Sequence, residues 1–212
     1  MRIVKPWFSL MIAISFVNAL EKEKFIIEIS LGNLEAEDKI DIYISPSCLH
    51  CGQFVAEDLE EFMDKHSAEI KVSIKFLPTS AKDVFIMKLL QNEAQDEKSY
   101  FAIYKKYIKR AIATINFVHP NEKQKVLYIG SPKDPEMIKF QVVASEFGFS
   151  NKKIVEAFPD PQMDKPFESA IMRSYAERVN IISKLINTKQ LDLPLIIKDE
   201  KVLKNLDDIF KK

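Results

Sequence analysis

Hydrophobic and polar positions alternate in three N-terminal stretches of the chain, and this pattern predicts β-strands. The first stretch, residues 25–29 (FIIEI), is short, whereas residues 39–45 (KIDIYIS) and 70–77 (IKVSIKFL) carry an apolar side chain at every second position. Between the last two, the apolar spacing lengthens to three or four residues, which predicts a helix beginning near Cys48. Strand, helix and strand in this order favour a right-handed crossover between parallel strands.

The middle of the chain lacks this alternation and is predicted to be helical. Helical spacing covers residues 81–95, 99–115, 134–147, 152–158 and 167–187. Glycine is scarce, with four in 212 residues, which favours long helices over an all-β fold. Strand character returns late, in residues 193–197 (LPLII), a turn at 199–200, a strand at 201–203 and a short closing helix at 206–210. The expected fold class is therefore α/β, with helices between a βαβ half and a ββα half.

The balance of charged residues argues against a nucleic-acid partner. Lys plus Arg and Asp plus Glu each number 31, so the formal net charge is zero and no nucleic-acid partner is expected. Basic residues do cluster at 105–110, beside aromatic ones, as an RNA-binding helix could have them. The spacing favours the solvent side of an amphipathic helix instead.

The N-terminus has the pattern of a secretory signal peptide. Arg2 and Lys5 precede an apolar run at residues 7–17, and the small Ala19 is followed by charged residues. We expect residues 1–19 to be removed and the mature chain to work in the periplasm, where disulfides persist. An uncleaved membrane anchor is the alternative, although the run of about 11 residues is shorter than the roughly 20 that a span needs.

The chain has only two cysteines, and both lie where the predicted strand meets the predicted helix. Cys48 would stand at the helix N-terminus, where free N–H groups and the helix dipole stabilise a thiolate. Cys51, almost one turn on, would be less exposed and close enough to form a Cys48–Cys51 disulfide. A protonated His50 between them would stabilise the thiolate further. Together these features predict a redox-active pair.

Two other interpretations of the cysteine pair stay open. A structural zinc site needs four ligands, and the chain offers three histidines but no second Cys-x-x-Cys, so no metal is expected. A purely structural disulfide would close so short a loop that it would hardly constrain the unfolded chain. Redox chemistry is the preferred interpretation.

These residues together carry a family resemblance. A Cys48–Cys51 pair after a strand, KFLP at residues 75–78, a long helical insertion and LPLII at residues 193–197 resemble the DsbA-like thioredoxin-fold proteins. The resemblance covers essentially all of the mature chain. It implies a thioredoxin-like fold with an inserted helical domain, divided as signal peptide 1–19, N-terminal half 20–80, inserted helices 81–188 and C-terminal half 189–212.

The resemblance also implies a wall opposite the cysteines. In that family the proline after the insertion is cis and faces the pair, which here would be Pro194. A cis bond would turn the backbone of Leu193 outward, to pair with an extended substrate beside Cys48, and Leu49 is grouped with these substrate-binding residues. The alternative is that Pro194 is an ordinary proline at the start of a strand.

Two departures from the family pattern concern redox strength. The usual proline-histidine dipeptide between the cysteines is Leu49-His50 here. The buried acid that many thioredoxin-like proteins carry six residues before the first cysteine is Ile42, and the adjacent Asp41 would point to the other face of the strand. These departures leave the redox potential open, but not the reaction class.

The function that the resemblance implies is an exported thiol:disulfide oxidoreductase that introduces disulfides into reduced client proteins, without a cofactor. A DsbB-type quinone-linked membrane protein would reoxidise it. We expect a monomer, because only about 20 residues separate Leu20 from Lys39, too few for the dimerisation domain of DsbC-type proteins. The alternatives are a disulfide isomerase or reductase on the same fold, and a secreted peptide-binding or chaperone module without redox activity.

Overall fold

The computed structural model describes residues 25–118, 135–158, 165–186 and 192–210 of the chain. The expected signal peptide at residues 1–19 therefore lies outside the described residues, and so does one of the three histidines, His119. None of the described helices has an apolar stretch long enough to cross a membrane.

The described strands form one mixed sheet in the order β1-β3-β2-β4-β5. The strands are β1 (Glu28–Gly32), β2 (Asp38–Ile44), β3 (Ile70–Phe76), β4 (Leu195–Lys198) and β5 (Lys201–Leu203). β2 and β3 pair in parallel, and every other pairing is antiparallel. The parallel crossover expected from the first half of the sequence is confirmed.

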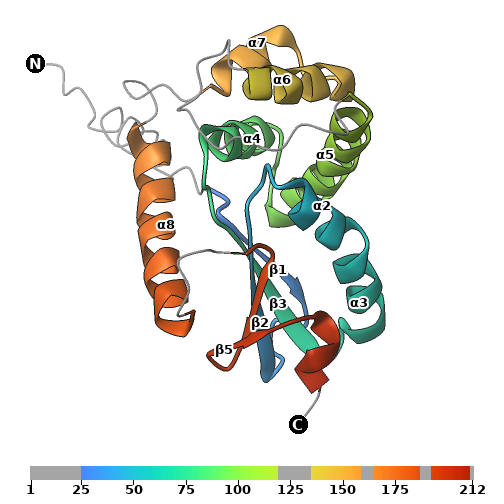
Figure 1. Cartoon of the computed structure of the whole chain (residues 1–212), viewed down its shortest axis with the longest axis vertical. Coiled ribbons are helices and arrows are strands. Elements are labelled where there is room, and N and C mark those ends of the chain that lie inside the picture. Colours follow the sequence, from blue (N-terminus) through green and yellow to red (C-terminus); the bar gives the residue numbers. More distant parts are fainter. Residues whose placement is uncertain (1–24, 119–134, 159–164, 187–191, 211–212) are drawn as a thin grey trace, which may run out of the picture.

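Helices fill both connections that the sequence left for them. α2 (Leu49–Ala56) and α3 (Asp58–His66) lie between β2 and β3. Between β3 and β4 come α4 (Ala81–Gln91), α5 (Glu97–Val118), α6 (Pro135–Phe147), α7 (Asn151–Glu156) and α8 (Lys165–Leu185). The chain closes with the short 3-10 helix η1 (Leu206–Phe210). This is the thioredoxin-like fold with inserted helices that the resemblance implied (Figure 1).

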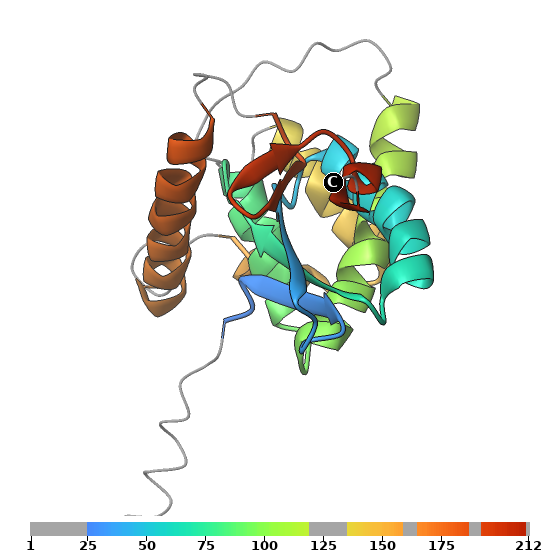
Figure 2. The ribbon, with the colours of Figure 1, turned by 90° about the horizontal axis from the view of Figure 1, so that it is seen from below.

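The sheet is covered on both faces. Ile40, Ile42 and Ile44 of β2 point into the main core, which α2, α3, α4 and α5 complete. Tyr43 points the other way, into a smaller cluster with Ile182 of α8. Figure 2 shows α8 alone on one side of the sheet, with α2, α3 and α5 on the other. The cysteines belong to the main core side.

Some element boundaries differ from the expected ones. β1 covers residues 28–32 and not 25–29, because its pairing with β3 starts only where the Phe76 N–H donates to the Ile27 carbonyl. The helix expected from Cys48 onward is two helices, since Glu57 between α2 and α3 has φ −120° and ψ −73°. β4 begins after Pro194, whose cis peptide bond precedes it.

The turn at the end of the chain is confirmed. Asp199 and Glu200 have φ of 49° and 60°, and Lys198 pairs with Lys201 on either side of them. Positive φ at both central residues is typical of the two-residue hairpin turn whose twist matches that of the strands.

Candidate active site

Cys48 occupies the N-cap position of α2, directly after the turn that ends β2. Its φ of −75° and ψ of 109° are extended, and its carbonyl accepts a hydrogen bond from Gly52 N–H at 2.9 Å, which opens the helix. Its own N–H donates to the Ser45 carbonyl at 3.1 Å. The strand therefore delivers the first cysteine to a helix N-terminus, as the sequence predicted.

The two sulfurs differ in exposure and are in contact. Cys48 is partly exposed, whereas Cys51 is fully buried, and both are free thiols in the described part of the chain. The Cys51 N–H donates to Cys48 Sγ at 3.2 Å. The Cys48 sulfur is thus accessible to a partner molecule, whereas the Cys51 sulfur is buried behind it.

The environment of the pair favours a thiolate on Cys48 alone. A hydrogen bond from the Cys51 thiol and those from the N–H groups of Cys51 and His50 lower the pKa of Cys48 to about 7, against the opposing effect of burial. The pKa of Cys51 is raised, first because its thiol donates to Cys48 and then because it is buried. At neutral pH the thiolate therefore forms on Cys48, while Cys51 stays protonated.

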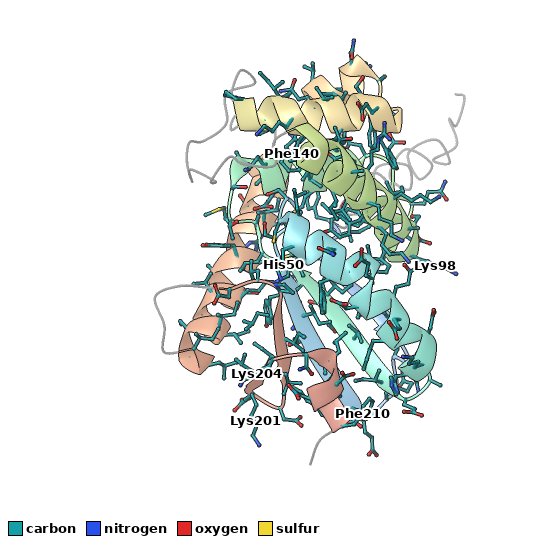
Figure 3. All side chains as sticks on the ribbon, turned by 45° about the vertical axis from the view of Figure 1, so that its right-hand side comes forward. His50, Lys98, Phe140, Lys201, Lys204 and Phe210 are labelled. Atoms are coloured by element: carbon teal, nitrogen blue, oxygen red, sulfur yellow. The ribbon has the colours of Figure 1, made fainter. Side chains whose placement is uncertain are left out.

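His50 lies on the outside of the first turn of α2, where it is exposed (Figure 3). Its backbone N–H contributes to lowering the pKa of Cys48. The additional role expected of a protonated imidazole stays a prediction.

The residues expected to form the opposing wall come from the start of β4. The Leu193–Pro194 peptide bond is cis, as the resemblance implied. Tyr43 of β2 pairs with Leu195 of β4, so the chain enters β4 at the end of the sheet where β2 leads into α2. Leu193 and Leu49 are partly buried against the core cluster that contains Cys51. Their contact with a substrate stays a prediction.

A buried carboxylate missed by the sequence analysis, Asp83, lies beside the site. It is the third residue of α4 and fully buried, and its Oδ1 accepts hydrogen bonds of 2.7 Å from both Ser45 Oγ and Ser47 N–H. The position expected from the family, residue 42, holds a fully buried isoleucine, so the acid near the cysteines comes from another element. Ser80 and Asp83 form a capping box, which the sequence pattern can reveal. The hydrogen bond between Asp83 and Ser45 cannot be inferred from the sequence.

Two buried tyrosines of α5 pack against the end of β3. Tyr100 and Tyr104 of α5 each pack a ring 5.5 Å from that of Phe76, the last residue of β3. Neither hydroxyl has a hydrogen-bond partner among the described residues. Burial raises the pKa of both, and for Tyr104 the nearby Cys51 and Cys48 add to the rise. Both tyrosines are therefore neutral at physiological pH.

No arrangement of ligands for a metal accompanies the pair. Within the described ranges, no group of three His, Cys, Asp or Glu side chains gathers closely enough to hold an ion. What the arrangement offers chemically is a stabilised thiolate in contact with a protonated thiol.

Comparison with known proteins agrees with this geometry. The model of the family described as Thioredoxin matches residues 26–141, more than half of the chain, and the match includes both cysteines. The chain belongs to the thioredoxin family. A search of curated protein sequences found no match.

Solved structures share the fold at low sequence identity. DsbA of Chlamydia trachomatis aligns with a TM-score of 0.53 and 16% identity, over 88% of each chain. A protein-disulfide isomerase from Novosphingobium aromaticivorans gives 0.51 and 12%, over 84% of this chain and 89% of its own. MdbA, a thiol-disulfide oxidoreductase from Corynebacterium matruchotii, gives 0.50 and 16%, over 84% and 83%. This member of the thioredoxin family therefore has a DsbA-like fold.

Proposed function

We propose that the chain is an exported thiol:disulfide oxidoreductase that introduces disulfides into reduced client proteins. The observation that carries the proposal is the contact between Cys48, with its pKa lowered to about 7, and the buried Cys51, whose pKa is raised. This asymmetry is what thiol–disulfide exchange needs, because one sulfur must react while the other leaves and is protonated.

In the proposed reaction the Cys48–Cys51 disulfide takes two electrons from a client dithiol. A client thiolate attacks Cys48 Sγ, the Cys48–Cys51 bond breaks, and Cys51 leaves and takes up a proton because its pKa is raised. The second client thiolate then attacks the client sulfur of the mixed disulfide. A client disulfide forms, and Cys48 leaves as the thiolate that its surroundings favour.

The proposal includes a compartment and an electron acceptor. The family resemblance supports a periplasmic monomer whose reduced pair passes its electrons to a DsbB-type quinone-linked membrane protein. Leu49, Leu193 and Pro194 would hold the client backbone beside Cys48, since an extended peptide can pair with the chain next to a strand.

A second candidate is a disulfide isomerase or reductase, and the pKa of Cys48 favours it. The first cysteine titrates at about 7 in thioredoxin and about 3.5 in DsbA. The value of about 7 for Cys48 therefore points to a weaker oxidant than DsbA. The equilibrium of the pair with glutathione separates the two candidates, because a potential near that of thioredoxin would exclude the oxidase.

The test of the proposed function is trapping in the native compartment. In the Cys51→Ala variant the Cys48 thiolate can attack a client disulfide, which frees one client thiolate and leaves a mixed disulfide. These adducts should accumulate, and mass spectrometry identifies them, because the Cys51 thiol that would attack Cys48 Sγ and release the client is gone. The Cys48→Ala variant is the matched control and should trap nothing. If both variants and the native chain support equal disulfide formation in a reduced client, the non-redox peptide-binding module is the better explanation.

A further inference from the structure

Asp83 holds the segment that leads into Cys48. Its Oδ1 accepts one hydrogen bond from the Ser45 side chain and one from the Ser47 backbone, both 2.7 Å long. Ser47 immediately precedes Cys48, and the Ser45 carbonyl accepts the Cys48 N–H at 3.1 Å. Two of the three residues that precede the first cysteine thus bond to one carboxylate.

The second oxygen of the same carboxylate holds the loop between β3 and α4. Oδ2 accepts the N–H groups of Thr79 at 2.7 Å and Ser80 at 3.0 Å, and both hydroxyls at 3.1 Å. Backbone N–H groups can only donate, so the carboxyl group acts as an acceptor throughout. Asp83 therefore joins the two loops at the carboxyl ends of β2 and β3 into one hydrogen-bonded unit.

The charge of Asp83 works against the thiolate next to it. The carboxylate is fully buried, so little solvent screens its field. The titratable groups that face it are Cys48 and Cys51 of α2 and Tyr104 of α5. Burial acts to raise the pKa of each, and the charge of Asp83 adds a smaller contribution in the same direction. The Cys51 thiol and the N–H groups around Cys48 lower the pKa of Cys48, and the charge of Asp83 opposes them.

We propose that Asp83 is a positioning residue that limits the oxidising power of the cysteine pair: it fixes the turn before Cys48 while its negative charge disfavours the Cys48 thiolate. The inference rests on the proposed function and makes it specific. Reduction of the pair is favoured when the thiolate is favoured, so a fixed negative charge beside Cys48 keeps the pair a moderate oxidant.

The direct test is the Asp83→Asn variant of the full chain. The amide keeps the size and an acceptor oxygen but removes the charge. Thiolate absorbance of the reduced protein should show the pKa of Cys48 falling by about one unit. The equilibrium constant for reduction of the pair by glutathione at pH 7 should rise about fivefold, since the fraction of thiolate in the reduced form increases.

Ser45→Ala is a second variant with the opposite expected sign. It removes one donor to Asp83 and keeps the charge, so the carboxylate is less compensated and the pKa of Cys48 should rise. Simple loosening of the loop would move both variants in the same direction. Asp96→Asn is the matched control, because Asp96 caps the start of α5 through the Ser99 N–H at 2.7 Å in an exposed turn, and neither quantity should change.

Each outcome decides the inference. A folded Asp83→Asn protein with an unchanged or higher Cys48 pKa overturns it, and so does a lower Cys48 pKa in Ser45→Ala. If Asp83→Asn does not fold, the sign in Ser45→Ala decides alone, with an unchanged pKa counting against the inference. Failure of the proposed function is seen separately, as a Cys51→Ala variant that traps no client although the Cys48 pKa of the otherwise native chain responds to Asp83→Asn as expected.

Discussion

Gly52 of α2 lies so close to Ile108 of α5 that no side chain fits between them. A Cβ added at position 52 would collide with Cγ1 of Ile108 and lie 3.3 Å from its Cβ. Gly52 directly follows the buried Cys51, so this close approach of α2 and α5 lies one residue from the cysteine pair. The glycine after the second cysteine is needed for packing and not for backbone freedom.

Replacing Gly52 by alanine should therefore destabilise the protein by about 1–3 kcal/mol, the usual cost of overpacking a core. The free energy of unfolding in urea measures it. Ile108→Ala should relieve the collision, so the double variant should lose less than the sum of the single losses. Gln53→Ala, at the exposed neighbouring position, is the control, and an equal loss there would contradict the packing explanation.

Alkylation of the reduced protein should follow the titration of Cys48. Because its pKa is lowered to about 7, the rate with iodoacetamide should rise between about pH 6 and 8 and then level off. Cys51 should stay unmodified over that range, since its pKa is raised and its sulfur is buried. Mass spectrometry after a timed quench locates the label. Equal labelling of both cysteines would disprove the asymmetry on which the proposed function rests.

The stability of the reduced form should depend on pH in a defined window. The folded pKa of Cys48, about 7, lies below the value of about 8.5 for an unfolded cysteine, so its stabilising contribution is complete above 8.5 and is lost as the pH falls through 7. The gain across the window is at most about 2 kcal/mol. Above 8.5 the raised pKa of Cys51 acts in the opposite sense. The oxidised form, which has no thiols to titrate, is the control in calorimetry.

Arg178 should anchor α8 to the sheet. It is buried, its guanidinium donates to the Phe76 carbonyl at the end of β3, and it lies 3.8 Å from Glu28 of β1. Arg178→Ala should cost about 1–3 kcal/mol, because the buried Phe76 carbonyl loses its charged donor, and should speed proteolysis within α8. Arg173 on the same helix is exposed, and its guanidinium donates to the Ser169 carbonyl one turn away, so Arg173→Ala should change stability by about 0.5 kcal/mol or less.

Two tyrosines on α5 allow a buried hydroxyl with a hydrogen-bond partner to be compared with one that has none among the described residues. The Tyr107 hydroxyl donates to the Phe140 carbonyl at 3.1 Å, whereas the Tyr100 hydroxyl has no partner among the described residues. Tyr107→Phe should lose about 1 kcal/mol, and Tyr100→Phe should leave the stability unchanged or raise it. Thermal unfolding compares them. A larger loss for Tyr100→Phe would mean that its hydroxyl has a partner, such as an internal water.

Local pattern was enough to predict the central strands and the position of the cysteines. Ile40, Ile42 and Ile44 alternate so regularly that β2 and its buried face follow directly, and the change of period at Cys48 marks the start of α2. The break at Glu57 could not be seen, because the apolar stripe continues through it into α3. The cis form of Pro194 came from the family resemblance and not from any local signal.

The role of Asp83 was beyond the reach of sequence for a different reason. The capping box with Ser80 is local and legible, but the bond to Ser45 joins residues 38 positions apart. Only the packing of α4 against the end of the sheet brings the carboxylate to the cysteines. The acid near a thiol pair can thus come from a helix when the strand position holds an isoleucine.

β5 is an edge strand of the sheet, and its length and charge protect that edge from pairing with another chain. β5 has three residues, and Lys201 and Val202 in it are exposed (Figure 3 labels Lys201 and Lys204, well away from His50). An edge strand this short offers little backbone for another chain to pair with. The lysines beside it would also repel the same lysines of a second copy of the protein. The protein can therefore leave this side of its sheet open to water without polymerising through it.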